Sequence, residues 1–243
     1  TSLPGDLGIG TFGREAYAFV DFLVETDQKF WQILPLTTTS FGDSPYQSFS
    51  AVAGNTHLID FDLLTLEGFI SKDDYQNISF GQDPEVVDYA GLFEKRRPVL
   101  EKAVKNFLQE ERATRMLSDF LQEEKWVTDF AEFMAIKEHF GNKALQEWDD
   151  KAIIRREEEA LAGYRQKLSE VIKYHEVTQY FFYKQWFELK EYANDKGIQI
   201  IGDMPIYVSA DSVEVWTMPE LFKLDRDKQP LAIAGVPADD FSD

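Results

Sequence analysis

The sequence predicts an α/β fold made of repeated strand–helix units, with a large helical segment inserted between two of them. Two apolar stretches of strand length, residues 30–36 and 198–206, each run into an irregular polar loop. Helical sequence of about 110 residues lies between them, which is longer than an ordinary connection between neighbouring strands. Repeated units of this kind build either a closed barrel or a doubly wound sheet.

The first unit begins with a helix over Arg14–Thr26, because apolar residues recur there at helical spacing: Ala16, Phe19, Val20 and Leu23. Phe30–Leu36 is almost wholly apolar, which is typical of a strand covered on both faces in a parallel sheet. A loop over residues 37–55 follows. We expect ordered structure to resume near Leu58–Leu64 and Ser71 to cap a further helix.

Residues 84–195 are predicted to be helical, since Glu, Lys, Gln, Leu and Ala dominate and only Pro84 and Pro98 interrupt them. Charges of both signs alternate there around apolar positions, which indicates solvated helix faces. We expect the last helix over Val177–Asn194 and its end at Gly197.

The second apolar stretch, Ile198–Ile206, is predicted to be another buried strand, with Asp203 at its carboxyl end. Ser209 or Asp211 is placed to cap a short helix after it. Ligands of α/β proteins bind at the carboxyl ends of strands, so the loops after both strands are the candidate functional region. An aspartate at such an end is solvated, bonded to backbone amides or bound to ligand, and the residue type leaves these alternatives open.

Net charge excludes several classes of partner. Of 243 residues, 44 are acidic and 25 basic, which gives a formal net charge of -19. A surface this negative repels phosphate backbones and anionic lipid, so we expect no nucleic acid and no membrane among the partners. A neutral ligand remains possible.

Cysteine is absent, which excludes disulfides and thiolate metal sites and suits a reducing compartment. No apolar run approaches the roughly 20 residues that cross a bilayer, and no signal-peptide pattern begins the chain. We therefore expect a cytoplasmic protein. Because the chain starts at Thr1 and stops at Asp243 without a closing helix or strand, we expect a fragment of a longer protein.

The stretch GIGTFG, Gly8–Gly13, has the spacing of a dinucleotide-binding loop and precedes a helix. That motif requires a strand before it and an acidic residue at the end of the next strand. Here Pro4 and Gly5 disrupt any preceding strand, and the next one ends in Leu34–Leu36. We interpret these glycines as turn formers and expect no cofactor.

The stretch Gly42–Ser50, GDSPYQSFS, gathers a carboxylate, hydroxyls, an amide and two aromatic rings. Sugars combine apolar C–H faces with hydroxyl edges, so they bind an aromatic ring flanked by hydrogen-bonding side chains. Tyr46 could supply the ring, with Asp43, Ser44 and Gln47 at the edges. Each residue alone has an equally good structural explanation, in which Asp43 and Ser44 cap a turn and Tyr46 packs in the core.

Three histidines are scattered along the chain: His57, His139 and His175. None stands at metal-ligand spacing from a carboxylate or beside a serine nucleophile motif. We interpret them as surface or packing residues and predict no metal site. Carboxylates are abundant, but no pair identifies itself as catalytic.

Several motifs occur together and in order: SLPGDLGIGTFG, WQILPL, GDSPYQSFSAVAGN, IIGDMPIYVSADSVEVW, PELFKLD and AGVPADDFS. In these motifs the chain strongly resembles the 4-alpha-glucanotransferases, also called amylomaltases or disproportionating enzymes, which are relatives of the α-amylases. The resemblance is densest at residues 1–64 and 197–243. It implies an α/β fold that is a partial (β/α)8 TIM barrel with a large helical insertion subdomain.

The resemblance also implies an activity, the transfer of α-1,4-glucan segments between maltooligosaccharides without a cofactor. In the retaining two-step mechanism, one carboxylate attacks the anomeric carbon and another carboxylic acid protonates the leaving oxygen. The family's nucleophile and acid/base motifs would lie beyond Asp243. We therefore expect no catalytic residue in this chain, and an isolated fragment without activity.

Matched residue by residue, Tyr46 resembles the tyrosine that stacks on the sugar at the cleavage subsite. Asp203 resembles the strand-end aspartate near the catalytic centre, which is not itself the nucleophile. The run GVPADDF resembles a mobile loop that covers bound glucan, and it retains Phe241. In that run Ala238 and Asp240 replace a proline and a tyrosine of the family pattern.

We expect three regions: residues 1–64 begin the barrel, residues 65–195 form a mainly helical insertion subdomain, and residues 196–243 continue the barrel with the substrate-covering loop. Two alternatives to the enzyme remain. One is a non-catalytic glucan-binding module that uses Tyr46 and Trp216. The other is a helical interaction module in which the inserted helices bind a partner.

Overall fold

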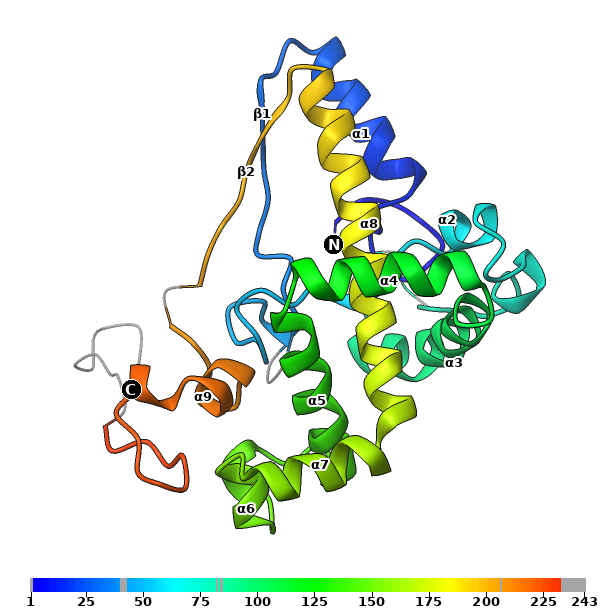
Figure 1. The fold of residues 1–243 in the computed structure, drawn as a ribbon. Helices are drawn as coiled ribbons and strands as arrows, with labels where there is room; N and C mark the ends of the chain where they lie inside the picture. Colours follow the sequence, from blue (N-terminus) through cyan, green and yellow to red (C-terminus); the bar gives the residue numbers. More distant parts are fainter. Residues whose placement is uncertain (1, 40–42, 82, 84, 206, 233–243) are drawn as a thin grey trace.

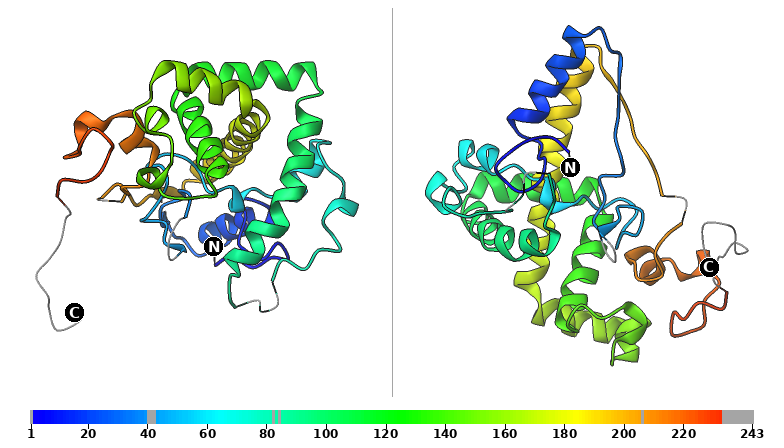
Figure 2. Two further views of the ribbon diagram at one scale, coloured as in Figure 1. Left: turned by 90° about the horizontal axis from the view of Figure 1, so that it is seen from below. Right: turned by 180° about the vertical axis from the view of Figure 1, so that it is seen from behind.

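A computed structural model of the chain describes residues 2–39, 43–81, 83, 85–205 and 207–232. Within these ranges it contains nine α-helices and one pair of parallel strands (Figure 1). The long helix α8 (Ser169–Asp195) crosses the molecule and packs against α1, α3, α4, α5 and α7. Other views of the ribbon show the same arrangement of helices around it (Figure 2).

The first helix, α1 (Arg14–Glu25), follows the predicted apolar spacing, with Ala16, Val20 and Leu23 buried. Five helices and then α8 fill the segment predicted to be helical, residues 84–195, in this order: α3 (Tyr89–Phe107), α4 (Glu111–Glu123), α5 (Trp126–His139), α6 (Lys151–Ile154) and α7 (Glu158–Lys167). The helical prediction for this segment is confirmed over its described residues, although α8 begins at Ser169 rather than at Val177.

The two predicted strands pair with each other in parallel. β1 (Phe30–Gln32) lies beside β2 (Gln199–Ile201), with Trp31 opposite Ile200. Figure 1 shows them side by side, although the whole helical segment separates them in the sequence. Parallel strands need a crossover connection between them, so this pairing is that of an α/β fold.

Both strands differ from the prediction in length and in burial. Each has only three residues. Phe30 is 56% exposed, Leu34 57% and Ile201 46%, so the prediction of two strands buried on both faces is wrong. The physical reason is that successive side chains of a strand point to opposite faces. Trp31 and Ile200 pack against the larger apolar core, whereas Phe30 and Ile201 lie on the opposite, exposed face of the strand pair.

Local end signals agree with the sequence at two places. Gly197 follows α8 with a φ of 80°, a left-handed conformation that favours glycine, and so confirms the predicted helix end. Ser71 precedes a short 3-10 helix, Lys72–Asp74, and binds the Asp74 carboxylate through both its N–H and its hydroxyl. The nearby helix α2 (Phe61–Leu66) has six residues.

Two apolar cores hold the helices together. The larger core joins α1, α3 and α8 and contains stacked and edge-on aromatic rings, such as Phe107 with Phe181 at 5.2 Å between centroids. The smaller core joins α5, α6 and α7 to α9 (Val213–Thr217). Its centre holds Trp148 and Trp216, both buried, and burial of each such ring contributes about 2–3 kcal/mol.

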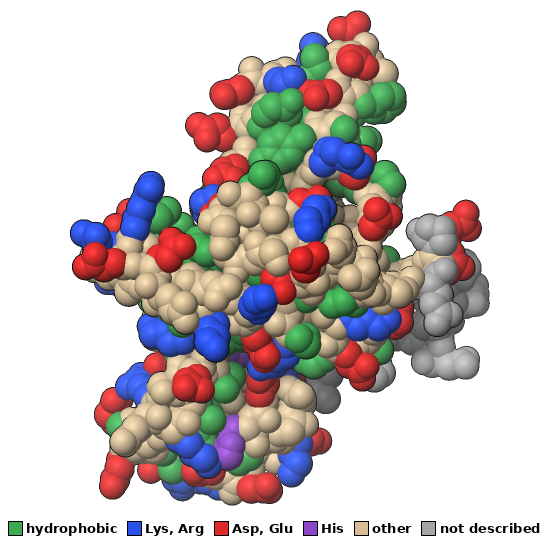
Figure 3. Space-filling view, turned by 90° about the vertical axis from the view of Figure 1, so that its right-hand side faces the viewer, with side chains coloured by type: hydrophobic (Ala, Val, Ile, Leu, Met, Phe, Trp, Pro, Cys, Tyr) green, Lys and Arg blue, Asp and Glu red, His purple; other side chains and the backbone are tan. Residues whose placement is uncertain are grey.

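Charged side chains of both signs are interspersed over the face drawn in Figure 3. Acidic residues outnumber basic ones, as the net charge of -19 requires. In the described part of the chain, every helix is too short or too polar to cross a membrane.

Candidate functional site

The loops that follow the two strands meet at Tyr46 and Asp203. The Tyr46 hydroxyl donates a 2.6 Å hydrogen bond to Oδ2 of Asp203, which lies two residues after β2. This bond raises the pKa of the Tyr46 phenol, because deprotonation would remove the donor and place a phenolate beside a carboxylate. Tyr46 is 43% exposed and Asp203 is exposed as well, so a ligand can reach both the ring and the carboxylate.

Ser44 shapes the turn that presents Tyr46. Its hydroxyl accepts the N–H of Tyr46 at 3.3 Å, and its carbonyl accepts the N–H of Gln47 at 3.2 Å. Asp43 adopts a φ of 54°, a left-handed conformation that aspartate tolerates better than most residues. The predicted cluster therefore includes a turn, as its structural explanation required, with Asp43 and Gln47 exposed on either side of Ser44.

Three further positions lie outside the described residues: Ala238, Asp240 and Phe241. Their part in covering a glucan stays a prediction.

The hydroxyl-rich loop after β1 is closed by its own side chains. The Thr37 hydroxyl donates to the Pro45 carbonyl at 2.9 Å, and the hydroxyls of Thr38 and Ser48 lie 2.8 Å apart. Thr37 also forms an antiparallel bridge with Gly54. The threonines and serines therefore fold the loop back on itself, which leaves Tyr46 exposed on its outside.

Two glutamines of α8 fasten this loop to the helices. Oε1 of Gln179 accepts the Gly54 N–H at 2.8 Å, and its Nε2 donates to the Gly54 carbonyl at 2.9 Å. Gln185 makes the same pair of bonds with the backbone of Asp60, at 2.7 and 3.1 Å. Both side chains are buried, where an unpaired amide would be costly. The bonds of Gln179 therefore fix the end of the loop relative to α8, and those of Gln185 fix the start of α2.

The glycine-rich motif GIGTFG forms turns and close contacts. Gly8 has a φ of 76°, and a Cβ atom at Gly13 would lie 2.0 Å from the carboxylate of Asp60. That carboxylate caps α2 through the Leu63 N–H at 3.0 Å and accepts the Thr11 hydroxyl at 2.6 Å. Among the described residues no strand precedes the motif. The interpretation as a turn former is confirmed for Gly8, whereas Gly13 allows a close approach to Asp60.

The segment after β2 is fastened to the helical insertion by a buried charge pair. Lys137 on α5 donates to Oδ2 of Asp211 at 2.5 Å and to the Lys143 carbonyl at 2.8 Å. The Lys137 side chain is only 3% exposed. Oδ1 of Asp211 accepts the Leu145 N–H at 2.9 Å, so both of its oxygens contact the insertion.

Asp211 makes these contacts instead of capping α9, and the next residue is the cap. The Ser212 hydroxyl accepts the Val215 N–H at 3.4 Å and caps the helix. The prediction of Ser209 or Asp211 as the cap is therefore wrong. The observed cap, Ser212, follows Asp211 directly.

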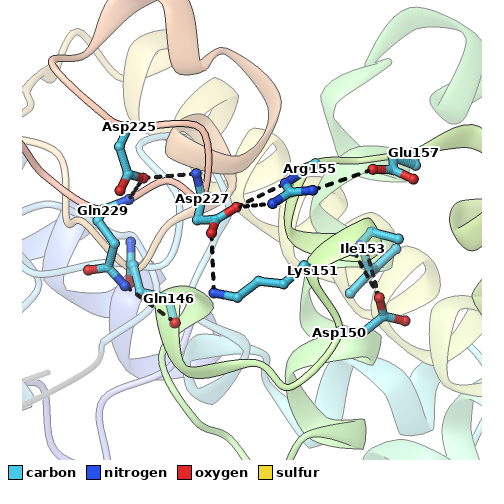
Figure 4. A network of polar contacts seen from close by, with 10 residues as sticks. Gln146, Asp150, Lys151, Ile153, Arg155, Glu157, Asp225, Asp227 and Gln229 are labelled. Atoms are coloured by element: carbon cyan, nitrogen blue, oxygen red, sulfur yellow. Dashed lines mark hydrogen bonds and ion pairs between the residues drawn. The ribbon is translucent and has the colours of Figure 1, made fainter.

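A second set of contacts attaches the turn around Asp227 to α6 (Figure 4). Oδ1 of Asp227 accepts two bonds from Arg155, at 2.9 and 2.7 Å, and Lys151 lies 3.5 Å from Oδ2. The bond from Arg155 lowers the pKa of Asp227. Asp225 closes the turn by accepting the N–H groups of Asp227 and Gln229.

A mainly apolar cavity of about 290 Å³, with a few charged side chains in its wall, lies between α3, α5 and α8. In its wall His175 bonds Glu138 at 2.9 Å, and Arg97 binds both oxygens of Glu138. Burial alone would raise the pKa of Glu138, but the bonds from His175 and Arg97 outweigh it and lower the pKa to about 2. Burial, with a smaller effect of the Arg96 charge, lowers the pKa of His57 to about 4.

His139 is exposed and lies 3.1 Å from Nζ of Lys167. Two histidines are therefore packing residues and one is a surface residue, in agreement with the prediction. Across the ranges that the structure describes, no group of three or more His, Cys, Asp or Glu side chains could hold a metal ion.

A mainly apolar cavity of about 590 Å³ lies between β1, α1 and α8 and is lined by Phe19, Trp31 and Trp186 among others. Neither Tyr46 nor Asp203 lines it. The Tyr46–Asp203 pair is thus an exposed site at the ends of the strands, separate from this cavity.

A family model for 4-alpha-glucanotransferases matches residues 1–243, the whole chain. The chain belongs to the 4-alpha-glucanotransferase family. It is 53% identical over 243 residues to the 4-alpha-glucanotransferase of Streptococcus pneumoniae and 45% identical over 245 residues to that of Clostridium butyricum. These alignments cover 100% of this chain but only 48% and 50% of the two relatives. The chain spans about half the length of the curated 4-alpha-glucanotransferases that it matches.

A solved structure agrees with the family. The crystal structure of amylomaltase from Corynebacterium glutamicum superposes with a TM-score of 0.68 at 15% identity, over 90% of this chain and 31% of that chain. At this identity the likeness shows the fold alone. Together with the parallel strand pair, it identifies the fold class as a partial (β/α)8 TIM barrel with a helical insertion, as the resemblance implied.

Sequence reasoning missed three buried polar residues of this chain that fix backbone segments following the strands: Lys137, Gln179 and Gln185. Each is a polar or charged residue that the helical pattern places among buried apolar neighbours, as Gln179 is followed by the buried Tyr180, Phe181 and Phe182. A buried polar side chain indicates a specific hydrogen-bonding partner, which was the available signal. Which backbone group is the partner depends on the tertiary structure.

Proposed function

We propose that the chain is the N-terminal part of a 4-alpha-glucanotransferase that transfers α-1,4-glucan segments between maltooligosaccharides. In this proposal Tyr46 and Asp203 bind one glucose unit of the donor, next to the bond that is cleaved. Family membership along the whole chain supports the reaction. The observation that carries the site is the hydrogen bond from the hydroxyl of the exposed Tyr46 to the carboxylate of Asp203.

The chemistry of this pair suits a neutral sugar. The Tyr46 ring would pack on the C–H face of a glucose unit, while Asp203 accepts a hydrogen bond from a hydroxyl at its edge. The bond between them holds the ring in place before the sugar arrives, which reduces the entropy lost on binding. Asp43, Ser44 and Gln47 flank the ring in the sequence and offer further polar contacts.

The retaining mechanism needs a nucleophilic carboxylate and a carboxylic acid about 5 Å apart across the glycosidic bond. The proposal assigns neither role to a residue of this chain, and it requires no cofactor. The residues of this chain bind and orient the glucan. An acceptor sugar that excludes water from the glycosyl intermediate favours transfer over hydrolysis.

The same proposal divides the chain into the start of the barrel (1–64), the helical insertion subdomain (65–195) and the continuation of the barrel (196–243), where Phe241 would contact glucan. A cytoplasmic location belongs to it as well and is supported by the cysteine-free sequence.

Incubation of the full-length protein with maltotriose tests the proposal. We expect glucose together with maltooligosaccharides longer than maltotriose, separated by chromatography. Release of glucose and maltose without longer products would show hydrolysis instead, and no reaction at all would also contradict the assignment. The isolated 243-residue chain is expected to form no longer products.

The alternative of a glucan-binding module relied on Tyr46 and Trp216. Trp216 is completely buried, and its Nε1 donates to the Ile153 carbonyl at 2.9 Å, so its predicted contact with glucan is wrong. The alternative of a helical interaction module is not favoured either. The large apolar side chains exposed on the described inserted helices are spread over α3, α4 and α8: Phe93, Met116 and Phe187.

A further inference from the structure

Glu214 joins the loop of Tyr46 to the segment after β2. None of its described hydrogen bonds involves Tyr46 or Asp203. Oε1 of Glu214, on α9, accepts the Ser50 hydroxyl at 3.0 Å and the Ala51 N–H at 2.7 Å. Next to these bonds, the Val213 N–H donates to the Phe49 carbonyl at 2.9 Å. One carboxylate thus holds Ser50 and Ala51, which lie four and five residues after Tyr46.

Ser50 also forms hydrogen bonds with neighbouring residues of the loop. Ser50 is fully buried, and its hydroxyl accepts the N–H groups of Val52 at 3.2 Å and Ala53 at 3.1 Å. Its own N–H donates to the Ser48 hydroxyl at 3.2 Å. A change at Glu214 therefore affects the whole turn between Ser48 and Ala53 rather than one side chain.

Helix α9, which carries Glu214, packs against the helical insertion. Trp216 of α9 packs 4.2 Å from the guanidinium of Arg156 and bonds the Ile153 carbonyl. Asp211, just before α9, holds the buried ammonium of Lys137. Helix α9 is therefore part of the insertion's core, and Glu214 extends that core to the loop of Tyr46.

The second oxygen of Glu214 makes this role more specific. Oε2 is buried and has no hydrogen-bond partner among the described residues. A buried carboxylate oxygen without a partner is destabilising, so the bonds of Oε1 must offset that cost. A glutamate serving only as a surface charge would leave both oxygens in water.

We propose that Glu214 is a positioning residue, which holds the loop after β1 against α9 through Ser50 and Ala51 and so keeps the Tyr46 hydroxyl within reach of Asp203. The effect on turnover rests on the proposed function, while the effect on the Tyr46–Asp203 pair does not. The helical insertion then has a defined part, as the rigid body against which the sugar-binding ring is placed.

The test uses the full-length protein with tyrosine labelled with ¹³C at Cζ, and the Tyr46 signal is identified by its loss in Tyr46→Phe. The bond to Asp203 raises the pKa of Tyr46, so its titration midpoint reports whether the pair is intact. We expect Glu214→Ala to move the midpoint toward that of an exposed tyrosine. Glu214→Gln should keep it, because the amide oxygen accepts the same two donors. Glu220→Ala, at an exposed glutamate of the next turn, is the matched control.

An unchanged Tyr46 midpoint in a folded Glu214→Ala protein would overturn the proposal, as would an equal shift in Glu220→Ala. If Glu214→Ala does not fold, Ser50→Ala decides in the same way, since it removes the donor hydroxyl and should shift the midpoint in the same direction. With maltotriose, we expect kcat/KM to fall about ten- to hundredfold in Glu214→Ala and to recover in Glu214→Gln. A shifted midpoint in a protein whose unaltered form lacks transferase activity would uphold the positioning role and refute the proposed function.

Discussion

Tyr46 and Asp203 are 157 positions apart in the sequence, and the phenol of the first donates a 2.6 Å hydrogen bond to the carboxylate of the second. The parallel pairing of β1 with β2 brings the loops that follow them to the same edge. The helices between the two strands fold outward around α8 and do not separate this pair. The contact is therefore a direct consequence of the α/β topology.

Substitutions of Tyr46 separate the ring from its hydroxyl. Under the proposed function, Tyr46→Ala should lower kcat/KM for maltotriose about tenfold, because the loss of an aromatic contact is worth about 1.5 kcal/mol. Tyr46→Phe keeps the ring and should lose less. The initial rate of glucose release measures both. The control is Tyr164→Phe, which removes a phenol hydroxyl bonded to Asp150 in the insertion and should leave the rate unchanged. Equal rates for Tyr46→Ala and the unaltered protein would count against the stacking role.

Gly54 is predicted to tolerate no side chain. A Cβ atom there would lie 2.1 Å from the Phe182 ring, while Gln179 holds the Gly54 backbone from both sides. We expect Gly54→Ala to lower the free energy of unfolding by about 1–3 kcal/mol or more, measured in urea. Gly163→Ala is the matched control, since α7 has open space at that position and alanine favours a helix by up to about 1 kcal/mol. Similar stability of the two variants would contradict this account.

The buried pair of Lys137 and Asp211 should be among the most sensitive charges of the chain. Lys137→Met removes the ammonium and leaves the Asp211 carboxylate facing the insertion without its cation. We expect a loss of about 3–5 kcal/mol in the free energy of unfolding. Lys143→Met breaks only a 3.4 Å pair with Asp149, which is 81% exposed, and should change stability by less than about 1 kcal/mol. A loss no larger than in this control would show that the pair is not a structural link.

The lowered pKa of His57 leads us to expect a loss of stability under mildly acidic conditions. Its pKa falls from 6.5 to about 4 on folding, chiefly through burial, so the unfolded chain binds a proton that the folded chain does not. Stability should therefore decrease as the pH drops from 6.5 to about 4, by up to about 3 kcal/mol from this group. His57→Gln should flatten the pH dependence of urea unfolding in this range, whereas His139→Gln should not.

Glu138 affects the pH dependence of stability at a lower pH than His57 does. Its folded pKa of about 2 lies below the ordinary 4.5, so its contribution is present above pH 4.5 and is lost as the pH falls toward 2. The two ranges barely overlap. A slope that persists between pH 6.5 and 4 in His57→Gln would exclude His57 as its source.

Much of the architecture was predictable because helices and their ends are determined largely by the residues close to them in the sequence. The spacing of apolar residues in α1 and the composition of residues 84–195 predicted helices, and Gly197 predicted the end of α8. The polar loops after both strands, which carry Tyr46 and Asp203, were predicted as the candidate functional region. Strand burial was not predictable in this way, since Phe30 and Ile201 are apolar residues whose exposure depends on which strands surround them.

By itself, the sequence determined the helix and strand order, the family motifs and the two loops that carry Tyr46 and Asp203. Tertiary structure alone decided which polar side chains hold those loops: Gln179 at Gly54, Lys137 at Asp211 and Glu214 at Ser50. The physical reason is that periodicity and turn chemistry act over a few neighbouring residues. A buried hydrogen bond, in contrast, joins groups that become neighbours only after the chain has packed.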